Sequence, residues 1–324
     1  MERRVKKMKK LLLMLCIISI MSSCSIKKMA FNSISDMMAP HPEKKKNIVS
    51  ETDPSLVIAG EDDITLAAEF FPTLLKTYEL LQLQNPKHRG LTMMTGSLFI
   101  MYANAFIQTP AEFLPDNQYE KQNAEYLRAK KFYLRGAKYV LKSLELQYPG
   151  FSENILSSDE QKIANALQQC KKFDVESLYW AGAGLLGAFS LEPLDPAITE
   201  SVLGAVAMLE KATELDPQYN QGAVWDLLTK FYAAAPEPLG GGMEKAKTAY
   251  EKLLQFSEGK SASAYVTYAR SLCIPQQDTK GFDKALEQAL AIDPNADPHN
   301  RFITILAQQQ AQWLKEHKED FFIE

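Results

Sequence analysis

Apolar residues recur at helical spacing through most of this chain. From Asp62 onward they return every three or four positions, which places them on one face of a helix. No segment there alternates apolar and polar residues as a strand does, and no Asn-Gly or Asp-Gly pair marks a hairpin turn. The pattern predicts a single all-α domain over residues 61–324.

Several of the expected helices end in the same way, with a proline that cannot continue the helix. Asp-Pro closes segments at Pro217 and Pro294, and looser versions occur at Pro86 and Pro149. Small or apolar residues stand five, eight and twelve positions before these prolines, which is typical of the second helix of a tetratricopeptide repeat. They are Ala212, Leu209 and Ala205; Ala289, Leu286 and Phe282; Leu144, Leu141 and Ala137; and Leu81, Tyr78 and Leu74.

The segments between these endings carry a matching first-helix pattern of large residues around one small residue. Trp225, Leu228, Thr229 and Tyr232 show it, and similar sets begin at Tyr265, Leu178 and Thr92. Pro86 and Pro149 are 63 residues apart, against about 34 in an ordinary repeat. We therefore expect a tetratricopeptide-repeat-like helical solenoid with extended, degenerate repeats. A C-terminal capping helix is expected from about residue 300 to 322.

The first 23 residues have the features of a lipoprotein signal peptide. Six basic residues precede an apolar run of eleven residues, Leu11 to Met21, which is too short to span a bilayer. The run ends in Met21-Ser22-Ser23-Cys24, which resembles a bacterial lipobox except that Leu usually stands where Met21 is. An ordinary signal peptide or a short membrane anchor is the alternative. We expect Cys24 to be lipidated and residues 24–60, with their prolines and lysine run, to form a flexible linker.

Charge and cysteine content narrow the possible functions. Removing residues 1–23 leaves 30 basic against 39 acidic residues, a net charge of −9, which argues against binding nucleic acid. Attachment to a membrane would then depend on the lipid. Cys170 and Cys273 are far apart and form no metal motif, so two buried free thiols are favoured over a disulfide.

Motifs of enzymes and cofactor sites are lacking. The four histidines show no metal-ligand spacing, and no nucleotide-binding, zinc-protease or hydrolase motif occurs. Gly182-Ala183-Gly184-Leu185-Leu186-Gly187 spells the dinucleotide fingerprint, but it lies within an Ala-rich helical segment and no strand precedes it. Close helix–helix packing explains these glycines better. We expect no catalytic residues, no metal and no cofactor.

Repeat solenoids bind along a concave face lined by their first helices. The repeat register selects for that face Met93, Ser97, Ile100, Tyr179, Ala183, Leu186, Asp226, Lys230, Ala233, Val266, Arg270 and Cys273. One interpretation is a groove that holds an amphiphile, with its tail on Ile100 and Leu186 and its head on Lys230 or Arg270. In that interpretation the two cations are neighbours without an acidic partner for each. The alternative is that these residues are core, or a solvated face with Asp226 and Lys230 as an i,i+4 pair.

A family resemblance rests on the order of these features. The lipobox Cys24, the degenerate repeats, the segment Leu178-Tyr179-Trp180-Ala181 and the proline-flanked segment from Asn220 to Pro236 together resemble the T-component (TatT family) of tetratricopeptide-protein-associated TRAP transporters. The resemblance covers nearly the whole chain after residue 23.

The resemblance implies a periplasmic lipoprotein of a bacterial membrane, the inner in preference to the outer. It would act as an accessory scaffold that binds the solute-binding P-subunit, and it would assemble as a homo-oligomer, a trimer. It also implies an apolar cleft for a hydrophobic small molecule such as a fatty-acid-like carboxylate. The main rival is a lipid-anchored repeat scaffold in outer-membrane β-barrel assembly, and a third hypothesis is a hydrolase whose site the sequence does not mark.

Overall fold

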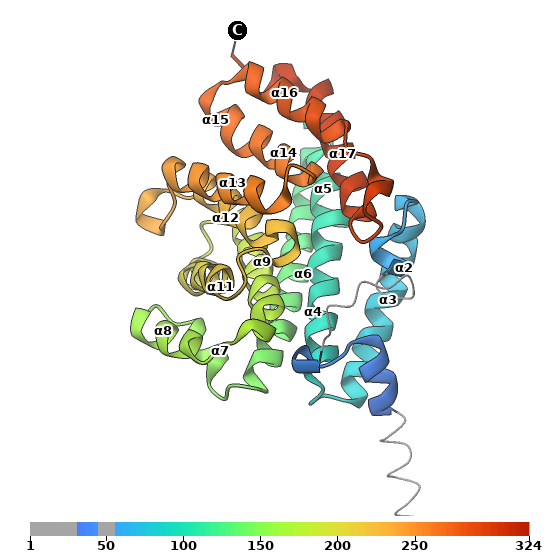
Figure 1. Cartoon of the computed structure of the whole chain (residues 1–324), viewed down its shortest axis with the longest axis vertical. Coiled ribbons are helices and arrows are strands. Elements are labelled where there is room, and N and C mark those ends of the chain that lie inside the picture. The colour runs from blue at the N-terminus through green and yellow to red at the C-terminus, as the bar shows by residue number, and fades with distance from the viewer. Residues whose placement is uncertain (1–30, 45–55, 324) are drawn as a thin grey trace, which may run out of the picture.

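The structure is a computed structural model that describes residues 31–44 and 56–323. Within these residues the secondary structure is helical, without a strand (Figure 1). The long helices are α3 (Ile64–Gln84), α4 (Arg89–Ala103), α6 (Tyr119–Glu145), α9 (Val175–Leu191), α11 (Val202–Leu215), α12 (Ala223–Ala234), α13 (Met243–Ser257), α16 (Thr279–Leu290) and α17 (Arg301–Glu316). The predicted all-α class is confirmed.

Shorter elements join and extend these helices. The α-helical ones are α2 (Leu56–Ala59), α5 (Thr109–Glu112), α7 (Phe151–Ile155), α8 (Glu160–Gln168), α10 (Pro196–Thr199), α14 (Ala262–Tyr268) and α15 (Ile274–Gln276). Single π-helical turns, η2 (Asn104–Gln108) and η7 (Ala269–Cys273), continue α4 into α5 and α14 into α15. The 3₁₀ turns are η1 (Pro42–Lys44), η3 (Asp116–Gln118), η4 (Lys172–Asp174), η5 (Tyr219–Gly222), η6 (Glu237–Leu239), η8 (Pro294–Ala296) and η9 (Lys318–Asp320).

Helices that lie near one another along the chain pack in pairs, α4 with α6, α9 with α11, α12 with α13, and α14 with α16. The residues predicted to share one face of the second helices are mostly deep in the core. Ala212, Leu209 and Ala205 are fully buried, as are Ala289 and Phe282. One second helix, α13, has no closing proline. It ends at Glu258 and Gly259, which both adopt left-handed backbone conformations. Such a conformation stops a helix without a proline.

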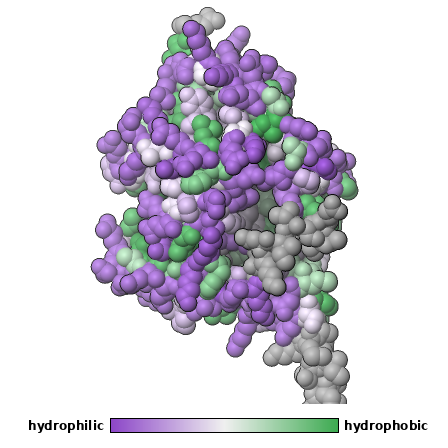
Figure 2. Space-filling view, viewed as in Figure 1, coloured by the Kyte–Doolittle hydropathy of each residue, from purple (hydrophilic) through white to green (hydrophobic). Residues whose placement is uncertain are grey.

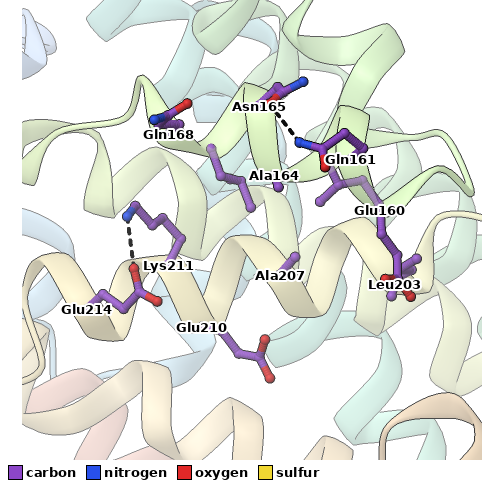
Figure 3. Close-up of a pocket in the computed structure, with 12 residues that line it drawn as sticks. Glu160, Gln161, Ala164, Asn165, Gln168, Leu203, Ala207, Glu210, Lys211 and Glu214 are labelled. Carbon is purple, nitrogen blue, oxygen red and sulfur yellow. Dashed lines mark hydrogen bonds and ion pairs between the residues drawn. The ribbon is translucent and has the colours of Figure 1, made fainter.

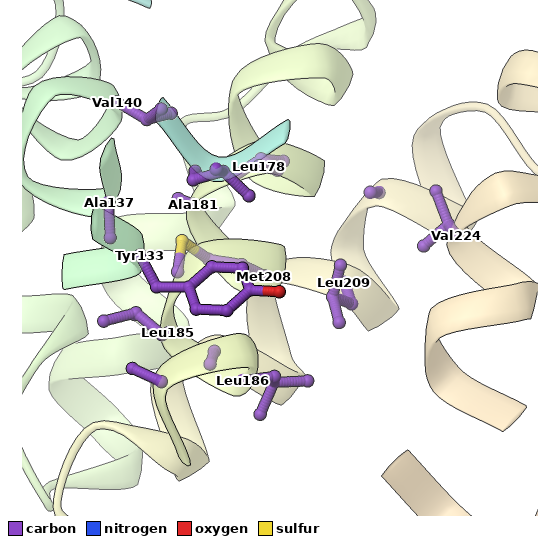
Figure 4. Packing of buried hydrophobic residues seen from close by; sticks show 14 of the residues in the cluster. Tyr133, Ala137, Val140, Leu178, Ala181, Leu185, Leu186, Met208, Leu209 and Val224 are labelled. Atoms are coloured by element: carbon purple, nitrogen blue, oxygen red, sulfur yellow. The ribbon is translucent and has the colours of Figure 1, made fainter. Parts of the chain in front are cut away.

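The three glycines of the false dinucleotide fingerprint lie at helix crossings, as expected. A methyl group on Gly182 would meet Leu209 of α11 at 2.7 Å, and one on Gly187 would meet the Tyr133 ring of α6 at 2.6 Å. Figure 4 shows this contact region, in which Tyr133 and Ala137 lie beside α9. The glycines therefore let α6, α9 and α11 approach closely, and they serve packing.

The capping helix α17 contacts both ends of the helical array. It packs on α14 and α16, as expected of a cap, and it also packs on α2 (Figure 1). Arg301 Nη1 donates a hydrogen bond of 3.2 Å to the Gly60 carbonyl oxygen, and the Phe302 ring lies 5.9 Å from the Phe106 ring. The C-terminal helices are thereby fixed to the N-terminal ones, and the array curves back on itself.

One helical run among the described residues is long and apolar enough to span a membrane. It covers Arg89–Glu112, but 78% of its most apolar window is buried inside the fold. Because neighbouring helices already cover this run, its apolar character is that of a central core helix.

Residues 31–44 differ from the flexible linker expected for residues 24–60. We call them the N-terminal strap. The strap is helical over residues 31–38, continues through Ala39, which is buried, and lies against α3 and α4. Tyr78 Oη donates to the Met38 carbonyl oxygen (3.1 Å) and Asn85 Nδ2 donates to Asn32 Oδ1 (2.8 Å). The expected signal peptide and the lipidated Cys24 lie outside the described residues.

Candidate functional site

The apolar positions predicted to line a groove lie inside the core. Met93 and Ile100 are each 3% exposed, Leu186 is 5% and Val266 is 4% exposed. Ile100 fills the space between Gly136 of α6 and Gly184 of α9, since a methyl group on either glycine would touch it within 2.9 Å. These side chains therefore pack helix against helix, and the groove that was predicted to hold an apolar tail is not formed by them. Tyr179 is half-buried, and its ring lies 5.6 Å from the Tyr219 ring, tilted by 50°.

The two predicted cations both have acidic partners, contrary to the expectation of an unpaired couple. Lys230 Nζ lies 2.6 Å from Asp226 Oδ2 one turn earlier in α12. Asp226 also accepts a 2.5 Å hydrogen bond from Thr267 of α14, which ties the two first helices together. Arg270 Nη1 lies 2.8 Å from Glu112 Oε2. Sequence spacing found the first pair, but the second joins residues 158 positions apart.

Glu112 and Arg270 both lie in or near a π-helical turn. Arg270 lies within η7. Glu112 is the last residue of α5, the helical turn that directly follows η2. A π turn inserts a residue and rotates the side chains that follow it, and such turns often occur at functional sites. Burial raises the pKa of the nearby Tyr126 hydroxyl, and the negative charge of Glu112 raises it further. Arg270 stays 39% exposed at its side chain and Glu112 19% exposed, so solvent and ligands can reach this ion pair.

A second candidate is a groove of roughly 610 Å³ between α8 and α11 (Figure 3). Ala164 and Ala207 form its floor, where small side chains leave space. Glu160, Glu210 and Glu214 line its rim, although Lys211 partly neutralises Glu214 at 2.8 Å. An apolar floor with an acidic rim suits a basic amphipathic segment rather than a small anion. Sequence reasoning missed this groove because α8 lies outside the repeat pattern.

A cluster of Asp36, His41 and His88 has the residue types of a metal site, with ligand atoms within 4.8 Å of one another. However, His88 Nδ1 accepts a hydrogen bond from the Leu91 backbone N–H (3.0 Å), so the neutral ring carries its proton on Nε2. That Nε2–H points at Asp36 Oδ1, 3.0 Å away. A metal ion on Nε2 would need the tautomer with its proton on Nδ1. That nitrogen could then no longer accept the Leu91 N–H bond that caps α4. Burial, and then His88, lower the pKa of His41. The cluster therefore holds the strap to the start of α4 through a hydrogen bond.

The chain is similar to known proteins over most of its length. An uncharacterized protein of Treponema pallidum (strain Nichols) is 51% identical over 304 residues, which is 94% of each chain. Residues 60–322 match the TRAP transporter T-component family, and this range contains the helical array from α3 to α17. The chain therefore belongs to the family of TRAP transporter T-components, which are accessory transporter proteins.

Proposed function

We propose that this protein is a periplasmic, lipid-anchored scaffold of a TRAP-type transporter that binds the solute-binding P-subunit. The family match over residues 60–322 carries the proposal, because it spans the whole curved helical array. We further propose that the array is a degenerate tetratricopeptide-repeat-like solenoid, since its helices pair in sequence order and the predicted second-helix faces are buried. Cys24 is the proposed anchor, and a homo-oligomer such as a trimer is the proposed assembly.

The Glu112–Arg270 pair is the proposed contact point for an anionic group, either a hydrophobic carboxylate or an acidic segment of the P-subunit. Arg270 is partly exposed and offers a planar guanidinium that binds carboxylates through two parallel hydrogen bonds. Glu112 already bonds Nη1 of that guanidinium, so its carboxylate competes with an incoming one. This competition gives opposite expectations for the two partners.

Variants of the two residues test this mode of binding. Arg270→Ala should weaken the binding of a fatty acid, or of a purified solute-binding P-subunit, about tenfold, or roughly 1.4 kcal/mol. Glu112→Gln should strengthen the same binding, because it leaves the guanidinium free. Lys230→Ala is the matched control, since its cation is paired within α12 and should leave affinity unchanged.

Affinity capture from membranes tests the transporter assignment itself. The solute-binding P-subunit should co-purify with the wild-type protein, identified by mass spectrometry. Capture of an outer-membrane β-barrel protein in its place would contradict the assignment. Equal affinity of Arg270→Ala, Glu112→Gln and wild type for both ligands would remove the ion pair from the mechanism but leave the captured partner in place.

A further inference from the structure

The N-terminal strap is fixed to the body through several independent contacts. His88 Nε2 and Asp36 Oδ1 are 3.0 Å apart, and Arg89 Nη1 and Glu43 Oε1 are 2.8 Å apart. The strap backbone also passes directly over Gly90, where a methyl group would come within 2.4 Å of the Ala39 and Pro40 carbonyl oxygens. Only glycine permits this approach. Whatever holds the N-terminus therefore also orients the body.

The chain before the strap limits the distance between the body and the proposed anchor. Seven residue steps separate Cys24 from Phe31, the first described residue. A chain spans at most about 3.6 Å per residue, so these steps reach about 25 Å. An acyl chain on Cys24 would lie in the bilayer, and Phe31, at the start of the strap helix, would then lie within that distance of the headgroups.

Exposed apolar side chains gather at this same end of the molecule. Ile34 and Met37 are 42% and 68% exposed and share one face of the strap helix, while Leu80 and Leu83 at the end of α3 are 60% and 71% exposed. The strap and the end of α3 are joined by the hydrogen bonds of Tyr78 and Asn85, so the four side chains lie at the same end of the molecule. Figure 2 shows pale and green surface beside the place where the chain enters the described structure.

These side chains are part of a wider bias. Of sixteen large apolar residues exposed within the described part of the chain, seven lie on the strap, α2 and α3. A soluble surface disperses such residues, and an apolar face next to an anchor suits the boundary between headgroups and acyl chains.

We propose that the end of the molecule that carries Ile34, Met37, Leu80 and Leu83 rests on the lipid bilayer, so that the anchored protein has one orientation. The opposite end, with α16 and the C-terminus, then points away from the membrane (Figure 1). This inference rests on the proposed anchoring through Cys24. Because the strap is bonded to the body, the lipid would fix how the body lies on the membrane. Partners in the periplasm would then contact the far end of the array.

Fluorescence quenching in vesicles tests the orientation. Full-length lipidated protein is placed in vesicles of phosphatidylethanolamine and phosphatidylglycerol that contain lipids with a nitroxide on the acyl chain. An environment-sensitive dye is attached to Met37→Cys, Leu83→Cys or, as the control, Ile323→Cys, which is 90% exposed at the opposite end. Cys170 and Cys273 are buried and should remain unlabelled under native conditions.

The dye at positions 37 and 83 should lose about half of its fluorescence, as expected for burial in the headgroup boundary, and the dye at 323 should lose little. Gly90→Val should displace the strap and abolish the quenching at 83 while the protein stays in the membrane fraction. Should Gly90→Val prevent folding, Tyr78→Phe combined with Asn85→Ala removes strap hydrogen bonds without a clash.

Two outcomes separate the inference from the anchoring on which it rests. Protein that pellets with the vesicles but shows the same fractional quenching at positions 37, 83 and 323 would overturn the orientation and leave the anchoring intact. Protein that stays in solution would show that the anchoring fails, and the orientation would fail with it.

Discussion

Arg89 offers the strongest test of how this fold is held together, because it is a buried charge with several partners. It is 5% exposed and stands at the first position of α4. Its guanidinium donates to Asp174 Oδ1 (2.9 Å), Gln147 Oε1 (3.0 Å) and the Ser143 carbonyl oxygen (3.3 Å), in addition to the strap residue Glu43. One side chain thus connects the strap, the end of α6 and the turn before α9.

Asp174 determines the size of the effect. It is fully buried, and besides Arg89 it accepts hydrogen bonds from the Tyr148 hydroxyl (2.6 Å) and the Lys171 backbone N–H (3.0 Å). Arg89→Met would keep most of the volume but leave this carboxylate without its cation. Breaking a buried pair by removing one partner costs about 3–5 kcal/mol, because the remaining charge is uncompensated. We expect Arg89→Met to lower the free energy of unfolding by that amount.

A double-mutant cycle with Asp174→Asn separates the ion pair from simple loss of packing. Urea unfolding followed by circular dichroism would give the unfolding free energy of the wild type, both single variants and the double variant. We expect the double variant to be more stable than the sum of the single effects by about 1.5–3 kcal/mol. Lys76→Met is the control, since Lys76 is 69% exposed in its pair with Glu79 and should change stability by less than about 1 kcal/mol. Additive single effects, or a loss at Arg89 below about 1 kcal/mol, would refute the reasoning.

Three further predictions address the anchor, the thiols and the core. Cys24→Ala should move the protein from the membrane to the soluble fraction, and wild type should incorporate labelled palmitate; absence of label would contradict lipidation. Burial raises the pKa of the Cys170 and Cys273 thiols to about 12, so both stay protonated at pH 8 and should react with iodoacetamide only after unfolding in urea; rapid native alkylation would disprove their burial. Gly136→Val should cost about 3 kcal/mol, because its side chain would lie 2.5 Å from Ile100, whereas Lys138→Val on the exposed face of α6 should cost less than 1 kcal/mol; equal losses in urea unfolding would contradict this account of the crossing.

The sequence alone determined the helical class, the paired-helix pattern and the family resemblance, because these depend on local periodicity. Apolar spacing fixes which helix face is buried, and a proline after Asp marks a helix end wherever the chain later folds. Local patterns also predicted that the glycines of α9 serve helix packing and that Cys170 and Cys273 are free thiols. The structure confirms both predictions. The Asp226–Lys230 pair was also within reach, because its members are one helical turn apart.

Only the tertiary structure decided which faces stay open to solvent and which charges meet. The register placed Ile100 and Leu186 on a possible groove, but neighbouring helices cover both, and coverage depends on how the array curves. Arg270, in η7, meets Glu112, at the end of α5, only because the folded array brings these distant segments together, and no sequence spacing encodes that contact. The strap likewise looked like a linker because its hydrogen bonds to the body join residues forty or more positions apart, such as Asn32 with Asn85 and Glu43 with Arg89, and local patterns carry no record of distant partners.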